Sequence, residues 1–146
     1  MTDFAVSPSQ AFTFENLEWD YTPLNGGFVL AGTLDVASLN AGQHYANGYV
    51  QSGLVLAKRT SDGLLVPYLD ASATSGVNVA FGVLRASVPI TRLSGGTTRT
   101  KVGVAVLRHG IVATNKLPYT VGNAALGGYL DANAQTDLRL IDFVTA

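Results

Sequence analysis

The two histidines, His44 and His109, are the side chains best suited to acid–base chemistry near neutral pH, and they lie far apart in the sequence. A catalytic triad or a metal site built on either would need acidic side chains from distant segments, and no spacing indicates such a cluster. The phosphate-binding glycine motifs, the Gly-x-Ser-x-Gly nucleophile motif and the His-Glu-x-x-His zinc motif are absent. We therefore expect a protein that is not an enzyme and has no catalytic residues, with surface or packing roles for both histidines.

The acidic stretch from Asp131 to Asp142 spaces its oxygen-bearing side chains somewhat like a calcium-binding loop. Such a loop requires glycine at its sixth position and glutamate at its twelfth, where this chain has Thr136 and Asp142. The flanking residues favour strands over the two helices that such a loop connects. We expect a polar turn here, followed by a final strand at Leu138–Val144, and we expect no metal ion and no cofactor.

Charged residues make up only 13% of the chain, against about 25% in an average soluble domain, which fits a protein that covers part of its surface against neighbours. Residues 1–57 contain acidic side chains but no lysine or arginine, whereas residues 58–116 contain most of the basic ones. Two interpretations are open: the regions attract each other, within one chain or between chains, or the clustering is a matter of chance in a chain with few charges. The basic residues are not interleaved with aromatic ones, so no nucleic-acid partner is indicated.

Neither a membrane nor an oxidising compartment is indicated by the sequence. The chain has no run of about 20 apolar residues. It has no cysteine, and its N-terminus lacks the basic and apolar regions of a signal peptide. We therefore expect no membrane partner and an intracellular site of production.

Aromatic side chains are concentrated in the first 25 residues, together with acidic residues and two prolines. Leu17, Trp19 and Tyr21 alternate with Glu18 and Asp20, a pattern that predicts an extended, amphipathic segment. We expect residues 1–25 to form an arm that lies on a surface, either on the body of its own domain or on a partner. We favour a partner bound by strand addition, because terminal segments are loosely held unless something fixes them.

Short strands and tight turns are predicted for the rest of the chain, because 16 glycines separate runs rich in valine, leucine, threonine and tyrosine. Gly82 is a candidate bulge, and His109 is expected in a turn. The predicted strands are Phe28–Leu34, a hairpin of Leu54–Lys58 and Leu64–Tyr68, Val77–Val88, Thr98–Arg108 and Leu138–Val144. Short helical turns are predicted around Val36–Ala41 and Asn123–Leu126.

A family resemblance follows from the order of several short apolar motifs. These are Ser52–Ala57, Gly63–Tyr68, Ala80–Leu84 and Val104–Gly110, the last followed by Leu117-Pro118. In this order and spacing they resemble the lambda-type phage head decoration proteins, over about residues 50–145. The residues before them, including the run Phe28–Leu34, depart from the short members of that family.

The resemblance implies a mostly β fold, a small compact β-tulip or barrel-like domain of short strands with an extended N-terminal arm. Residues 1–25 would be the capsid-binding arm, residues 26–52 a linking segment with an extra strand, and residues 53–146 the decoration core. The arm would contact the capsid through Phe4, Phe12, Phe14, Leu17, Trp19 and Tyr21.

The resemblance also implies partners and a location. The protein would form a homotrimer, bind the major capsid protein at threefold and quasi-threefold positions on the outer surface of an expanded head, and stabilise the head as a cement. It would thus be a virion protein assembled in the host cytoplasm.

Two other functions are compatible with the residues. One is a different virion β-module, from a tail or fibre, which would occupy another position on the particle. The other is a small hydrolase or carbohydrate-binding domain, which would need a concave pocket with clustered acids or exposed aromatics.

Overall fold

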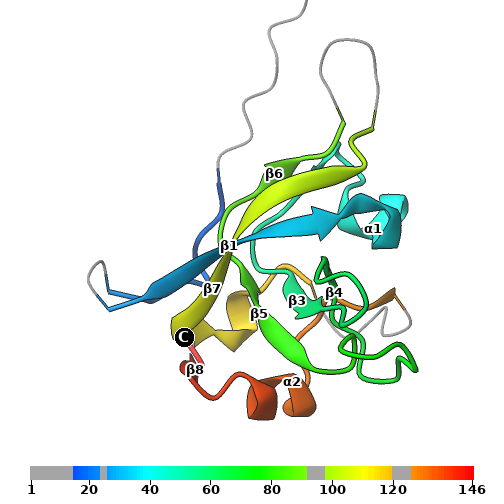
Figure 1. The fold of residues 1–146 in the computed structure, drawn as a ribbon. Coiled ribbons are helices and arrows are strands. Elements are labelled where there is room, and N and C mark those ends of the chain that lie inside the picture. Colours follow the sequence, from blue (N-terminus) through cyan, green and yellow to red (C-terminus); the bar gives the residue numbers. More distant parts are fainter. Residues whose placement is uncertain (1–14, 24–25, 92–97, 120–125) are drawn as a thin grey trace, which may run out of the picture.

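In a computed structural model, residues 15–23, 26–91, 98–119 and 126–146 are described (Figure 1). The domain is mostly β and small, which confirms the predicted fold class. No helix among the described residues is long and apolar enough to span a bilayer. The elements in chain order are β1 (Phe28–Asp35), η1 (Val36–Ser38), α1 (Ala41–His44), β2 (Tyr49–Val50), β3 (Val55–Lys58), β4 (Leu65–Pro67), β5 (Ala80–Leu84), β6 (Val88–Pro89), β7 (Lys101–Ala113), η2 (Thr114–Lys116), α2 (Ala132–Asp137) and β8 (Ile141–Val144).

The main sheet has the strand order β1-β4-β3-β5-β7-β8, and β1 also pairs with β7. This second pairing closes β1, β4, β3, β5 and β7 into a ring, as in a small barrel. The closure between β1 and β4 is a single pair, Leu34 with Leu65, whereas β1 and β7 pair from Phe28 opposite His109 to Asp35 opposite Lys101. Strand β7 is therefore the long wall of the ring, and β2 and β6 form a separate two-stranded sheet beside it.

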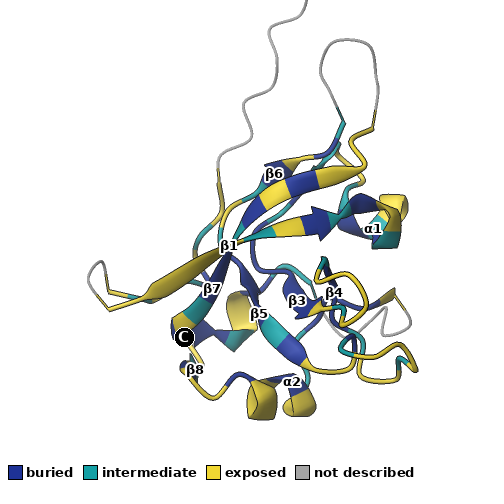
Figure 2. Ribbon diagram, in the orientation of Figure 1, coloured by how far each residue is buried: buried dark blue, intermediate teal, exposed yellow. Residues whose placement is uncertain are grey.

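Two hydrophobic cores lie on opposite faces of the ring strands, because successive side chains of a strand point to opposite faces. The inner core draws on all five ring strands, through residues such as Leu34, Leu56 and Val104. The outer core lies between the ring and the C-terminal elements, and includes Val55 of β3 and Ile141 of β8. Strands β3 and β4 bury both faces, so they are uninterrupted apolar runs in the sequence (Figure 2).

The pairing shifts register at two facing positions. Phe28 lies opposite His109 and Val29 opposite Leu107, which leaves Arg108 unpaired. On β5 the shift falls at Phe81, next to the predicted bulge at Gly82. The guanidinium of Arg108 lies 4.1 Å from the centroid of the Phe81 ring and donates to the carbonyl oxygen of Phe81. A cation–π contact thus joins the two irregular positions.

Several predicted elements are confirmed. The hairpin is present as β3 and β4, which pair antiparallel with Leu56 opposite Pro67. The run Phe28–Leu34 forms most of β1, and the helical turn predicted around Val36–Ala41 is present as η1. The turn predicted around Asn123–Leu126 lies almost wholly outside the described residues.

Two local predictions are wrong. His109 does not lie in a turn, because β7 continues through Gly110 to Ala113. The polar turn predicted after Asp131 is helix α2, since the Asp131 carboxylate accepts a hydrogen bond from the backbone N–H of Ala134 (2.7 Å) and caps the helix. The final strand consequently begins at Ile141 rather than at Leu138.

Gly82 is required by the close approach of β5 to β7. A Cβ atom at this position would collide with Val106 Cγ1 and lie 2.7 Å from the carbonyl oxygen of Leu107. We expect Gly82→Ala to lower the free energy of unfolding by about 1–3 kcal/mol, measured by urea denaturation, because the two strands must separate. Gly103→Ala on β7 is the matched control, because a Cβ there meets no atom within 4 Å. Equal stability of the two variants would contradict this explanation.

Candidate functional site

Residues 15–23, here called the anchored segment, run antiparallel along the last part of β7. The backbone N–H of Tyr21 donates to the carbonyl oxygen of Ile111 (2.9 Å), and the N–H of Ala113 donates to that of Trp19 (2.7 Å). Asp20 lies between these two bonds, opposite Val112. The segment is therefore extended, as its alternating sequence predicts, and it extends the sheet of its own domain.

The Trp19 side chain occupies a slot in the outer core and is 1% exposed. Its indole N–H donates to the Ser52 hydroxyl (3.2 Å), which is fully buried and itself donates to the carbonyl oxygen of Asn16 (3.1 Å). Gly53 shapes the slot, because its φ of +99° suits glycine and a Cβ there would lie 3.3 Å from the indole nitrogen. The buried polar groups of the slot are thus hydrogen-bonded, and the ring is fixed in one position.

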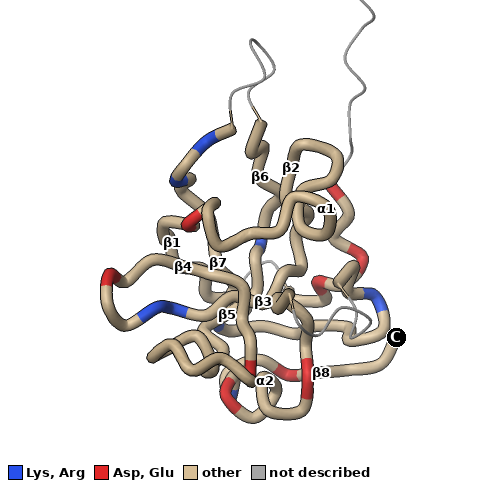
Figure 3. The backbone as a smooth tube through the Cα atoms, turned by 90° about the vertical axis from the view of Figure 1, so that its right-hand side faces the viewer, with Lys and Arg blue, Asp and Glu red and all other residues tan. Residues whose placement is uncertain are grey.

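Polar contacts hold the anchored segment at both ends. The nearly buried carboxylate of Asp20 forms an ion pair with Arg85 (2.9 Å). The carboxylate of Glu15 accepts hydrogen bonds from the backbone N–H (2.9 Å) and the hydroxyl (2.8 Å) of Ser87. The ion pair joins an acid of the N-terminal region to a base of the middle region, so the two regions attract each other here within one chain. Figure 3 shows how the acidic and basic residues are distributed along the described backbone.

The residues predicted for the capsid-binding arm fall into two groups. Phe4, Phe12 and Phe14 lie outside the described residues, and their contact with a capsid stays a prediction. Leu17 packs against the outer core, and Tyr21 is 48% exposed. Trp19 lies on its own domain, the alternative to the partner that we favoured, because Ser52 and Gly53, far away in the sequence, form a slot for it.

His44 has a packing role. Its Nδ1 accepts from the backbone N–H of Asn40 (2.9 Å), so the ring proton lies on Nε2 and points at the carbonyl oxygen of Gly127 (3.1 Å). Burial lowers the pKa of His44 from 6.5, and the weaker opposing effect is the hydrogen bond to Gly127. Burial also raises the pKa of Tyr119 to about 12, so its hydroxyl stays protonated and donates to the carbonyl oxygen of His44 (3.1 Å).

A polar hollow of about 210 Å³ lies beside His44. Amides and aromatic rings line it, among them Gln43, Asn47, Gln51 and Tyr49, and no acidic side chain does. Within the described part of the chain, no group of three or more histidine, cysteine or acidic residues is placed to hold a metal ion. The clustered acids that a glycosidase needs are therefore not found in this hollow.

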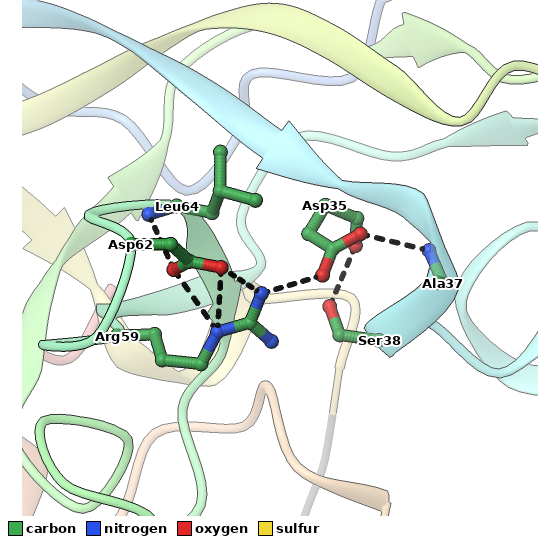
Figure 4. A network of polar contacts seen from close by, with 6 residues as sticks. All are labelled: Asp35, Ala37, Ser38, Arg59, Asp62 and Leu64. Atoms are coloured by element: carbon green, nitrogen blue, oxygen red, sulfur yellow. Dashed lines mark hydrogen bonds and ion pairs between the residues drawn. The ribbon is translucent and has the colours of Figure 1, made fainter.

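A second set of ion pairs fixes the C-terminal end of β1 (Figure 4). The guanidinium of Arg59 lies 2.8 Å from the carboxylate of Asp35 and 2.5 Å from that of Asp62. Asp62 also accepts from the N–H of Leu64 in the β3–β4 turn, and Asp35 accepts from the N–H of Ala37. The Arg59 hydrogen bond holds the pKa of Asp62 below its ordinary value. These contacts join the end of β1 to the β3–β4 hairpin.

Comparison with known proteins identifies one family. The family model described as Bacteriophage lambda head decoration protein D matches residues 24–138, well over half of the chain. The match begins directly after the anchored segment and includes β1, the ring and α2. A search of curated proteins found no match.

We expect Trp19→Ala to lower the free energy of unfolding by about 3–5 kcal/mol, because it empties a closed slot and leaves the Ser52 hydroxyl without a donor. Tyr21→Ala is the matched control on the same segment, and we expect a change below about 1 kcal/mol because its side chain is largely exposed. Urea denaturation measures both. An arm that is free of its own domain would instead give two equally small effects.

We expect stability to fall as pH decreases through 6.5, because the unfolded chain then binds a proton that neutral, buried His44 does not. Above pH 6.5 the contribution of neutral His44 to the free energy of unfolding is fully present. Below pH 6.5 this free energy falls by up to about 1.4 kcal/mol per pH unit, until His44 is protonated in the folded protein too. Urea denaturation between pH 7.5 and 5.5 tests this. His44→Gln should lose the dependence, and His109→Gln, at an exposed position, should keep it.

Proposed function

Since this chain belongs to the bacteriophage lambda head decoration protein D family and has a capsid decoration role, we propose that it binds the outer surface of an expanded phage head as a homotrimer. It would bind at threefold and quasi-threefold positions and stabilise the shell as a non-enzymatic structural protein. The family match over residues 24–138 is the observation that carries this proposal.

The N-terminal residues before the anchored segment are proposed to contact the major capsid protein. Strand addition would supply main-chain hydrogen bonds, and Phe4, Phe12 and Phe14 would supply aromatic anchors. Trp19 is not available for this role because it fills a slot in its own domain. The proposed arm is therefore residues 1–14, shorter than the 25 residues that the sequence predicts.

The anchored segment would decide where the arm leaves the domain. Glu15, the first described residue, is hydrogen-bonded to Ser87, which follows β5, so the anchored segment begins at this point of the domain. Three arms fixed in this way on a trimer would bind together, and modest affinity per arm becomes strong attachment when the arms match the spacing of their sites. Binding would then favour the head form whose sites match the spacing of the three arms.

Deletion of residues 1–14 tests the proposal. We expect the truncated protein to keep its unfolding midpoint and size but to bind expanded, undecorated heads at least about 100-fold more weakly in a co-sedimentation assay. Phe4→Ala, Phe12→Ala and Phe14→Ala combined should reproduce much of this loss, and Leu140→Ala, at an exposed position outside residues 1–25, should bind like the unchanged protein. Full binding by the truncated protein would contradict the assignment of the arm.

Deletion of residues 1–23 is a useful comparison. It removes Trp19 and the Asp20–Arg85 ion pair, so we expect lower stability as well as lost binding. Electron microscopy of decorated particles would show whether the bound protein lies on the head or on a tail or fibre.

A further inference from the structure

The polar hollow beside His44 has a lining that is rich in hydrogen-bonding groups but carries no charge. Three side-chain amides and two tyrosines line it: those of Gln43, Asn47, Gln51, Tyr49 and Tyr119. No lysine, arginine, aspartate or glutamate is among the described residues of the lining. A charged ligand would lose its hydration here without gaining a counter-charge. The lining therefore favours a neutral ligand that both donates and accepts hydrogen bonds.

Hydrogen bonds between distant segments hold the walls of the hollow in place. The Tyr119 hydroxyl accepts from the backbone N–H of Gln51 (3.1 Å) and donates to the carbonyl oxygen of His44 (3.1 Å). Across the hollow, Gly48 has a φ of +83°, and its carbonyl oxygen accepts from the N–H of Ile90 (2.9 Å), which ties the turn before β2 to the residue after β6. A ligand would thus meet a preformed site, and binding to such a site requires little ordering of the protein.

Gln43 leaves one hydrogen-bonding group in the wall of the hollow without a partner. Its Oε1 is buried, and within the described part of the chain it accepts no hydrogen bond. Buried polar atoms are nearly always hydrogen-bonded, so an unpartnered one calls for a partner that the chain does not supply. The Gln43 backbone is fixed, because its N–H donates to the Asn40 side chain (3.1 Å), but the terminal torsion of a glutamine turns easily. The amide can therefore turn its oxygen toward a hydroxyl or N–H donor in the hollow.

The size of the hollow fits a single small ring. Its volume of about 210 Å³ lies below the roughly 300–1,000 Å³ of sites for drug-sized ligands. A sugar ring carries several hydroxyls, each of which donates and accepts, and its C–H groups pack against aromatic rings. A peptide group offers one donor and one acceptor only. Three amides and two tyrosines gathered in one hollow match the sugar ring better.

We propose that the polar hollow binds one unit of a neutral saccharide, with Gln43 and Asn47 as hydrogen-bonding residues and Tyr49 as the aromatic surface. The site would bind the saccharide without cleaving it, because no carboxylate of the described chain lines the hollow. This function adds to capsid decoration and does not depend on where the protein lies on the head. Many copies on one particle would attach it to a saccharide-coated surface, because weak sites act together.

Nuclear magnetic resonance of the isotope-labelled full chain tests the binding itself. Glucose, galactose, mannose and N-acetylglucosamine are titrated separately. At least one should shift the amide signals of residues 43–51, with a dissociation constant of about 1–10 mM, as expected for a ligand of about a dozen heavy atoms. Glucuronate should bind at least about tenfold more weakly than that neutral sugar, because its carboxylate meets no cation in the hollow.

Three results of these titrations would overturn the inference. One is the absence of any shift with all four neutral sugars at about 100 mM, well above the expected dissociation constant. Another is equal or tighter binding of glucuronate, because the site would then not select neutral ligands. The third is a shift of residues 43–51 by acetylglycinamide and by none of the sugars, because the hollow would then recognise peptide groups.

Gln43→Leu tests the residue that motivates the proposal. It removes the amide but keeps an apolar side chain of similar volume, so the sugar should bind about five- to tenfold more weakly without a lower urea midpoint. Gln135→Leu is the matched control, because it makes the same change at an exposed position of α2, and it should bind normally. Asn47→Ala, at an exposed position of the lining, should also weaken binding and keeps the test decisive if Gln43→Leu does not fold. Unchanged sugar binding in both hollow variants would overturn the assignment.

Discussion

Strand β7 is the element on which the rest of the structure depends, because four other segments pair with it. β1 pairs along Lys101–His109, β5 pairs at Val106 and Leu107, and β8 and the anchored segment pair near its end. Val106 points into the inner core and the neighbouring Leu107 into the outer core. A shift of β7 by one residue would exchange these faces, so its register fixes both cores and the anchored segment together.

This arrangement fixes residues 15–23 on the domain, so the proposed capsid contact falls to the residues before them. The anchored segment is fixed by Trp19, which lies in the outer core. It is also fixed by the ion pair of Asp20 with Arg85 and by the hydrogen bond of Glu15 with Ser87. The contacts are made by distant parts of the same chain, so they form when the domain folds. An arm that starts from such a fixed point loses less freedom on binding than one whose whole length is loose, and preorganisation of this kind increases affinity.

The sequence predicts elements whose signals are local, and it fails where the reason lies far along the chain. The β3–β4 hairpin is predictable because Asp62-Gly63 forms its turn and Gly63 has a φ of +71°. The extension of β7 through Gly110 is not predictable from the neighbouring residues, because the need for this glycine comes from a distant segment. A Cβ atom at Gly110 would collide with Thr22 of the anchored segment. Likewise, no residue near Trp19 in the sequence indicates the slot at Ser52 and Gly53. The side chains from Asp131 onward are spaced somewhat like calcium ligands, although the Asp131 carboxylate caps a helix. The order of the short apolar motifs predicts the head decoration family, and the match of the family model to residues 24–138 confirms this prediction.

Hydrogen–deuterium exchange on the free protein and on the protein bound to expanded heads tests the division of the N-terminal region most directly. We expect the amide of Tyr21 to be protected in both states, because it is hydrogen-bonded to Ile111 within the domain. Residues 1–14 should gain protection only on the heads. Rapid exchange at Tyr21 in the free protein, with protection of the whole of residues 1–23 appearing on binding, would contradict the division and make the entire segment an arm.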